Sequence, residues 1–349
     1  MRIVSEQSLL PLANTDLRTD EPGRSWWAGM QKLEEKAEVV SARSIWIDPR
    51  TGAGFTASGH RVPDLVHWQQ RMHMPGRREW LRGIGTAQHV RAAVSLRDSA
   101  METNWYHFLV DLLGGRLRLV DSAIGTGQPV IIGPNLPPQM MDALRLGAMR
   151  EREWVVQPRD RWMRVGRLTF ARAPRHDPAA IDYLWGQLAV PKSDPSAKDR
   201  LLVAREPGTG RAWSNHAEVM DVARRFGLRL IHPATTSLGE QMERFGNASL
   251  VVGGHGAGLT GIVWRREAPL SVVDVQMRGR ALPMRNFAAL CAAMGARYVA
   301  VGEDLWRGPS ERPWGTTQPT WKQDPIHVNP LALARAIESC LDGSSVEPL

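Results

Sequence analysis

The sequence predicts an α/β protein made of two Rossmann-like domains that face each other across a cleft. The chain has 349 residues, more than one compact core normally holds, and this length suits two domains. In both halves short apolar strands alternate with amphipathic helices, which is the rhythm of right-handed βαβ units on a parallel sheet. A polar, proline-containing segment at residues 191–199 is typical of a linker or surface loop.

The N-terminal half is expected to contain a leader and one α/β domain. Residues 1–40 are predicted to be an irregular leader, and residues 41–176 the N-terminal domain. Residues 44–59 alternate around turn residues and predict a hairpin, and residues 104–120 carry apolar side chains at helical spacing. Further strands are expected at 89–96, 128–134, 154–158 and 167–174, and a helix at 137–149.

The C-terminal domain is predicted to cover residues 177–349. Its first helix spans residues 177–190, with Asp177 as a cap for the first turn. The closing helix, residues 329–341, can pack on this domain or back on the N-terminal one. Strands are expected at 200–205, 228–233, 249–254, 270–275 and 297–301, and the remaining helices at 215–227, 238–248, 284–295 and from about Leu259.

The charge of the chain admits several partners and disfavours one. The formal charge is +8 at pH 7, and arginine carries most of the positive charge. Arginine suits phosphate, so a nucleotide, nucleic acid, an acidic polymer or a membrane surface would each fit. The arginines are scattered and do not form a tract with interleaved aromatic residues, which disfavours a nucleic-acid-binding protein.

Cysteine usage and apolar runs bear on compartment and metal content. Cys291 and Cys340 are the only cysteines, which fits a reducing cytoplasm without a disulfide framework. The N-terminus lacks the apolar core of a signal peptide, and no apolar run is long enough to span a membrane. No histidines have metal-ligand spacing and no two aspartates lie two positions apart. We therefore expect a cytoplasmic protein with no metal and no cofactor.

The most informative stretch is VVGGHGAGLTG, residues 251–261, which is nearly bare of side chains. A buried strand runs into glycines and then into a helix start. Such a start exposes unpaired N–H groups, and glycines let an anion approach them, so a phosphate-bearing ligand is favoured. Close helix–strand packing alone is one alternative. A redox dinucleotide site is another, because Gly256, Gly258 and Gly261 match the spacing G-x-G-x-x-G.

Several motifs together resemble glycosyltransferase family 61, the family of capsular polysaccharide biosynthesis proteins. The glycine loop followed by VVDV resembles the family's HGAGLTN-like loop and the acid that closes its next strand. LLVAREPG, residues 201–208, is similar to an upstream Ser-Arg strand, and residues 104–120 are similar to an N-terminal-domain helix. The resemblance covers about residues 45–340. Departures from the family pattern are Ala204 for serine, Gly115 for proline, Gly261 for asparagine and Asp274 for glutamate.

The resemblance implies a two-domain GT-B architecture and an inverting, metal-independent transfer of a hexosyl or pentosyl group from a nucleotide sugar, with a UDP-sugar favoured. The acceptor would be a glycan or a lipid-linked glycan in surface or capsular polysaccharide synthesis. That location also admits a peripheral contact with the inner membrane. The nucleotide would bind the C-terminal domain, with the acceptor on the N-terminal side. A non-catalytic nucleotide- or glycan-binding protein of the same fold is the alternative.

The expected donor site combines cationic, backbone and acidic groups. Arg205 follows a strand and is expected to pair with the diphosphate, unless it is a solvated surface arginine. His255 can bind the diphosphate or fix the loop, and Asp274 can accept from a ribose hydroxyl or simply lie at a strand end in water. The predicted nucleotide-sugar-binding residues are Arg205, Gly254, His255, Gly256, Ala257, Gly258, Leu259 and Asp274.

The expected catalytic group lies on the helix at residues 104–120. An inverting transferase needs a base to deprotonate the acceptor hydroxyl. His107 is the candidate, with Asp111 four residues later as its orienting partner or as the base itself. The alternative for His107 is a buried histidine with a structural role. Asn104 and Arg116 are predicted to lie on the acceptor side, where Arg116 can bind an anionic acceptor or extend into solvent.

Overall fold

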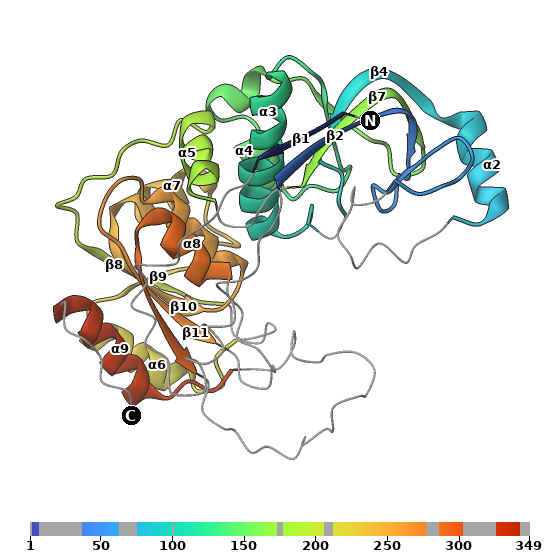
Figure 1. Ribbon diagram of the computed structural model, residues 1–349. Helices are drawn as coiled ribbons and strands as arrows, with labels where there is room; N and C mark the ends of the chain where they lie inside the picture. Colours follow the sequence, from blue (N-terminus) through green and yellow to red (C-terminus); the bar gives the residue numbers. More distant parts are fainter. Residues whose placement is uncertain are drawn as a thin grey trace. The chain divides into compact units, whose positions relative to one another are not determined.

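A computed structural model describes residues 2–6, 37–62, 75–99, 101–172, 177–205, 212–276, 286–302 and 326–342. Contacts divide the chain into two compact units that separate between Val190 and Pro191, and each unit has its own β-sheet (Figure 1). The predicted α/β class is therefore confirmed. No helix of the described residues is long and apolar enough to cross a membrane.

The first unit is built on a mixed seven-stranded sheet with the order β1-β2-β7-β4-β5-β6, and β3 pairs with β2. Strands β7, β4, β5 and β6 are parallel, whereas β2 runs antiparallel to β7, β1 and β3. The expected hairpin is confirmed, with Trp46 opposite Phe55. The strands are β1 (Arg2–Glu6), β2 (Ala37–Ile47), β3 (Gly54–Phe55), β4 (Gln88–Ser95), β5 (Val130–Ile132), β6 (Trp154–Val156) and β7 (Met163–Arg172).

The helix expected at residues 104–120 forms, but it is wound in two ways. A π-helix, η2 (His107–Leu117), continues as the α-helix α3 (Arg118–Ile124). Helix α5 (Pro178–Gln187) packs on η2 at Gly114, where a Cβ would lie 3.0 Å from Leu184. Asp177 caps α5 as predicted, by accepting from Ala179 N at 3.0 Å. The other helices are α2 (Arg77–Thr86), α4 (Pro138–Ala143) and the 3₁₀ helix η3 (Gly147–Glu151).

The second unit has a fully parallel five-stranded sheet with the order β12-β11-β10-β8-β9. This is the doubly wound order 2-1-3-4-5, in which the strand order reverses between the first and third strands. Buried β-branched residues dominate its centre, as expected for strands covered on both faces. The strands are β8 (Asp199–Val203), β9 (Arg229–Ile231), β10 (Ala248–Gly254), β11 (Ser271–Gln276) and β12 (Arg297–Gly302).

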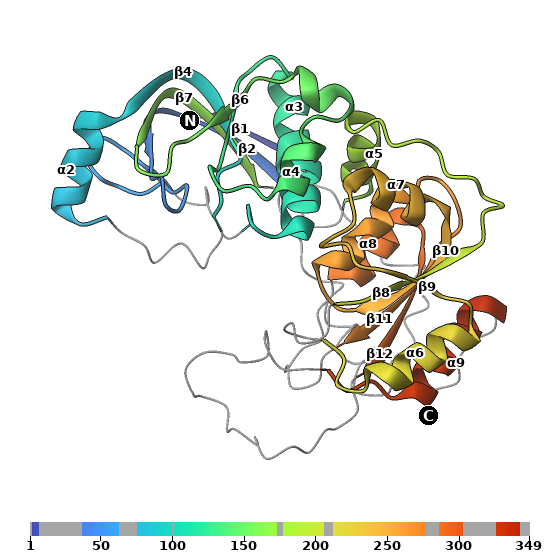
Figure 2. The same ribbon diagram turned by 180° about the vertical axis from the view of Figure 1, so that it is seen from behind.

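Helices cover both faces of this sheet (Figures 1 and 2). Helices α6 and α9 pack together on one face, and α7, η4 and α8 pack on the other. The closing helix α9 contacts β11, β12 and α6, so it packs within the second unit. The helices are α6 (His216–Arg225), α7 (Leu238–Asn247), the 3₁₀ helix η4 (Ala257–Trp264), α8 (Asn286–Met294) and α9 (Pro330–Asp342).

Two boundaries differ from the sequence analysis. Residues 2–6 form the edge strand β1 instead of an irregular leader, because they pair with β2 from Arg2–Ser41 to Glu6–Ala37. The expected leader between residues 7 and 36 lies outside the described residues. Helix α5, which we placed at the start of the C-terminal domain, belongs by its contacts to the first unit, since its apolar face packs on η2.

Candidate functional site

The glycine loop lies at the point where the second sheet reverses its strand order. Strands β8 and β10 are neighbours, and the helices that follow them, α6 and η4, cover opposite faces of the sheet (Figures 1 and 2). In open α/β sheets, ligands bind outside the carboxyl ends of the strands at this switch point. Arg205 follows the carboxyl end of β8, and residues 255–259 follow that of β10, whose last residue is Gly254. The topology therefore brings the two predicted donor-binding segments together at the carboxyl end of the second sheet.

Some glycines of the loop serve close packing. A Cβ on Gly253 would lie 2.9 Å from Val203 Cβ, and one on Gly258 would lie 3.1 Å from Val203 Cγ1. The 3₁₀ helix η4 begins at Ala257, and its first hydrogen bond is from Leu259 N to Gly256 O at 3.0 Å. The N–H groups of Ala257 and Gly258 come before this bond in the chain, and the first N–H groups of a helix have no acceptor within the helix itself. Leu259 itself is fully buried.

A buried polar network holds His255 in place. Its Nδ1 lies 2.8 Å from Asp274 Oδ2, its backbone N donates to Val275 O at 2.9 Å, and its ring meets Phe287 edge-on. Asp274 is 0% exposed, and the same Oδ2 also accepts from Tyr298 OH (2.8 Å) and Gln276 Nε2 (2.6 Å). These contacts indicate that Asp274 positions His255, and that His255 fixes the loop, rather than that Asp274 meets a ribose directly.

Arg205 is partly buried at the same carboxyl end of the sheet. Burial lowers the pKa of its guanidinium, because a charge removed from water is less stable. An anion bound beside it would offset this cost. Gly254 lies nearby on β10, and the indole Nε1 of Trp213 would lie 3.4 Å from a Cβ on Gly254. Trp213 was not predicted, since nothing in its local sequence indicates that it approaches the glycine loop.

In the first unit, η2 brings together the histidine and aspartate that the sequence analysis paired. His107 Nδ1 lies 2.7 Å from Asp111 Oδ2, and the side chains are 26% and 8% exposed. Asn104 Oδ1 accepts from the backbone N–H groups of Tyr106 (3.0 Å) and His107 (3.3 Å), so its side chain caps this helix. With Nδ1 directed at a carboxylate, the neutral imidazole presents Nε2 as its acceptor. This is the tautomer that a general base requires.

The π winding also affects Arg116. In a helix with i→i+5 hydrogen bonds, residues five apart share one side, as Asp111 and Arg116 do. Arg116 Nη2 lies 3.3 Å from Oδ2 of the fully buried Asp98. Arg116 is therefore oriented by a buried acid rather than extended into solvent. Asp98 was not predicted, although it follows the carboxyl end of β4.

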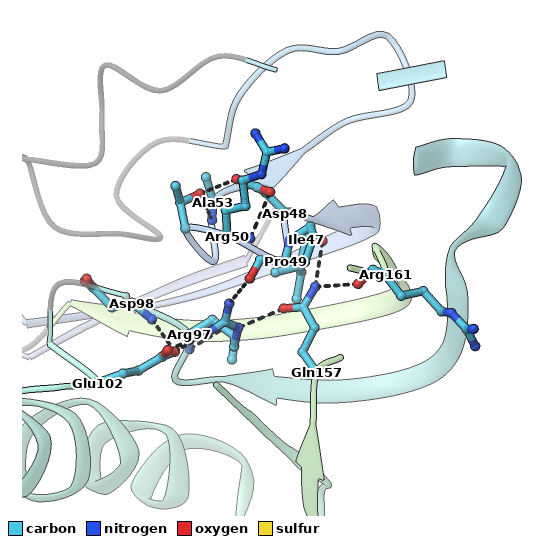
Figure 3. A network of polar contacts seen from close by, with 12 residues as sticks. Ile47, Asp48, Pro49, Arg50, Ala53, Arg97, Asp98, Glu102, Gln157 and Arg161 are labelled. Carbon is cyan, nitrogen blue, oxygen red and sulfur yellow. Dashed lines mark hydrogen bonds and ion pairs between the residues drawn. The ribbon is translucent and has the colours of Figure 1, made fainter. Parts of the chain in front are cut away.

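Asp98 belongs to a buried network around Arg97, which Figure 3 shows from close by. The Arg97 guanidinium donates to Glu102 (2.5 Å to both oxygens), to Gln157 Oε1 (2.8 Å) and to Pro49 O (2.8 Å). Asp98 N donates to Glu102 Oε1 at 2.9 Å. Burial raises the pKa of the Glu102 carboxyl, against the lowering effect of Arg97. The network ties the turn after β2 to the segment that leads into η2.

The described residues contain no group of three histidine, cysteine or acidic side chains placed to hold a metal ion. The predicted metal independence stays a prediction. The two sites that the structure describes are thus a His–Asp pair on η2 and a glycine loop beside Arg205 at the switch point of the second sheet.

A family model described as Glycosyltransferase 61 matches residues 105–273. This match supports assigning the chain to glycosyltransferase family 61. The assignment implies glycosyltransferase activity, with a sugar donor and an acceptor as substrates. The matched region begins one residue after Asn104 and ends one residue before Asp274, so it includes the His107–Asp111 pair, Arg205 and the glycine loop. We found no match among curated proteins.

The structure also gives a physical reason for one departure from the family 61 pattern. Gly261, where the family usually has asparagine, packs against the fully buried ring of Phe245. A Cβ at this position would lie 2.3 Å from Phe245 Cε2. The ring of Phe245 therefore fills the space that a side chain at position 261 would need.

Proposed function

We propose that the protein is an inverting, metal-independent glycosyltransferase that transfers a sugar from a nucleotide sugar, favoured to be a UDP-sugar, to a glycan or lipid-linked acceptor in surface polysaccharide synthesis. The observation that carries the proposal is that one family 61 match contains both a His–Asp pair with base geometry and a glycine loop at a sheet switch point. The GT-B arrangement and the transfer of a hexosyl or pentosyl group are part of the proposal, from the resemblance.

The second unit is proposed to hold the donor. The N–H groups at the start of η4 and the Arg205 guanidinium are positive groups suited to a diphosphate. In the absence of a metal they would also stabilise the charge that develops on the leaving nucleotide. His255 and Asp274 are proposed to fix the loop geometry through their 2.8 Å hydrogen bond.

The first unit is proposed to activate the acceptor. His107 Nε2 removes the proton from the attacking hydroxyl as its oxygen bonds to the anomeric carbon and the bond to the nucleotide breaks. Asp111 holds Nδ1–H and stabilises the imidazolium that results. Arg116, fixed by Asp98, is proposed to bind an anionic group of the acceptor. Asn104 contributes by capping η2 rather than by contact with the acceptor.

The test combines binding and turnover with the full-length protein. A thermal-shift panel of UDP-, GDP-, ADP- and CMP-sugars identifies the donor. Arg205→Ala is then expected to weaken donor binding about 10- to 100-fold, as loss of a charge-assisted hydrogen bond does. His107→Ala is expected to lower kcat about 10²- to 10⁴-fold with donor affinity unchanged. His89→Ala, which removes an exposed histidine of β4, is the control.

Two results would contradict the proposal in different ways. Near wild-type turnover by folded His107→Ala would remove this residue from the mechanism. Tight donor binding without transfer to any acceptor would favour the alternative, a non-catalytic nucleotide- or glycan-binding protein. Binding of NAD instead of nucleotide sugars would support the redox dinucleotide alternative.

A further inference from the structure

Helix α2 (Arg77–Thr86) presents one face to the core of the first unit and the other to solvent. Trp80 and Ile84 pack against a cluster of Trp46, Phe55 and Trp162, and the indole of Trp162 lies against Gly83. Trp80 meets Trp162 edge-on, with 5.2 Å between the ring centroids. The inner face of α2 is therefore anchored by aromatic packing, and the helix is a fixed part of the unit.

The outer face of α2 combines positive charge with an exposed leucine. Arg78, Leu81, Arg82 and Gly85 are spaced three and four residues apart, so they share one side of the helix, and all four are exposed. Leu81 is 59% exposed. The one acid of the helix, Glu79, forms an ion pair with Arg50 at 3.0 Å, so its charge is balanced by that arginine. The exposed face is thus an apolar side chain flanked by two cations.

Strands of the same unit also carry exposed arginines. Arg91 of β4, the strand that follows α2 in the chain, is exposed. Arg43 of β2 and Arg167 of β7 lie directly opposite each other in the sheet register, and both are exposed. Like charges facing each other across strands are destabilising, and an anionic partner relieves that repulsion. Among the described residues, neither arginine forms an ion pair with a carboxylate.

We infer that the outer face of α2 docks the protein on an anionic membrane surface, with Leu81 entering the headgroup region and Arg78 and Arg82 contacting lipid phosphates. Peripheral membrane binding combines burial of apolar area at the headgroup boundary with attraction to anionic lipids, and Leu81 and the two arginines would supply these two contributions. Each arginine near an anionic leaflet adds to the attraction. An acidic polymer would match the arginines but would gain nothing from Leu81. The inference extends the proposed function, because it concerns where the transferase meets a lipid-linked acceptor.

The test is sedimentation of the full-length protein with vesicles of phosphatidylcholine alone or mixed with phosphatidylglycerol. Binding to the anionic vesicles, weakened by salt, is expected. Arg78→Ala with Arg82→Ala should lower the partition coefficient about tenfold or more. Leu81→Ser should lower it to a similar extent. Because all three side chains are exposed, each variant is expected to fold as the parent does. Thermal unfolding checks this.

The second unit offers matched controls. Arg224→Ala with Arg225→Ala removes two exposed arginines from α6, and Leu331→Ser changes a leucine of α9 that is also 59% exposed. Both should bind vesicles as the parent does. Equal losses in the control pair, absence of binding to anionic vesicles, or no effect of Leu81→Ser would each overturn the inference. Vesicle binding uses no nucleotide sugar, so such a result would leave the proposed transferase activity intact.

Discussion

The buried carboxylate of Asp274 gives the sharpest prediction for the glycine loop. Its Oδ2 accepts hydrogen bonds from Tyr298 OH at 2.8 Å and Gln276 Nε2 at 2.6 Å, and lies 2.8 Å from His255 Nδ1. Asp274→Asn keeps the size of the side chain but removes its charge. It also replaces an acceptor with a donor unless the amide is oriented with its oxygen toward all three partners.

The expected loss of stability depends on how many hydrogen bonds to Asp274 no longer have a charged acceptor. A hydrogen bond to a charged group contributes about 1.5–3 kcal/mol, and one between neutral groups about 0.5–1.5 kcal/mol. A loss of roughly 1 kcal/mol at each of three bonds predicts that Asp274→Asn lowers the free energy of unfolding by about 3 kcal/mol. Tyr298→Phe removes one donor only, and a loss of about 1–2 kcal/mol is expected.

Urea denaturation followed by tryptophan fluorescence measures the stability, and calorimetry measures donor binding. Asp221→Asn on α6, whose carboxylate is 65% exposed, is the control and should change stability by less than about 0.5 kcal/mol. Donor affinity should fall for Asp274→Asn, since His255 loses its anchor. Wild-type stability for Asp274→Asn, or a loss no larger than that of the control, would refute the assignment of Asp274 as the anchor of the loop.

Two further predictions concern stability alone. Gly261→Ala should destabilise the protein by about 1–3 kcal/mol in urea denaturation, because the added Cβ collides with Phe245. The control is Gly239→Ala, which has no atom within 4 Å of the added Cβ and should stabilise α7 by about 0.5–1 kcal/mol. Equal effects of the two variants would contradict the packing argument. Burial, with the hydrogen bond to Asp121, raises the pKa of the Tyr183 phenol, whereas unfolded tyrosine ionises near pH 10. The contribution of Tyr183 is therefore complete below about pH 10 and is lost as pH rises, so Tyr183→Phe should reduce the alkaline loss of stability measured by urea denaturation across pH.

Local patterns in the sequence were sufficient to predict the second sheet and the His–Asp pair. The apolar strands between amphipathic helices specify a parallel doubly wound sheet, because only buried strands can be apolar on both faces. The spacing of His107 and Asp111 predicted their contact, since residues four apart meet on a helix of either winding. In both cases the determining interactions are local, and so they can be derived from neighbouring residues.

The Arg97 network could not be predicted in this way. Its members come from the turn after β2, the end of β4, the segment before η2 and the end of β6 (Figure 3). Which of many scattered arginines would be buried depends on strand order, and the antiparallel placement of β2 beside β7 has no local signal. The close approach of α5 to η2, where a Cβ on Gly114 would lie 3.0 Å from Leu184, likewise joins residues far apart in the sequence.

Asp274 shows why a correct local prediction can still give an incomplete role. The sequence correctly placed an acid near the end of β11, and a strand-end acid can face solvent, a ligand or the protein interior. The outcome depends on β12, whose Tyr298 is aligned with Val272 and reaches Asp274 Oδ2 through its hydroxyl. Gln276, two residues further along β11, supplies another donor. Three donors therefore hold one oxygen of this fully buried carboxylate away from water, and the contacts that determine where it lies come from His255, Gln276 and Tyr298.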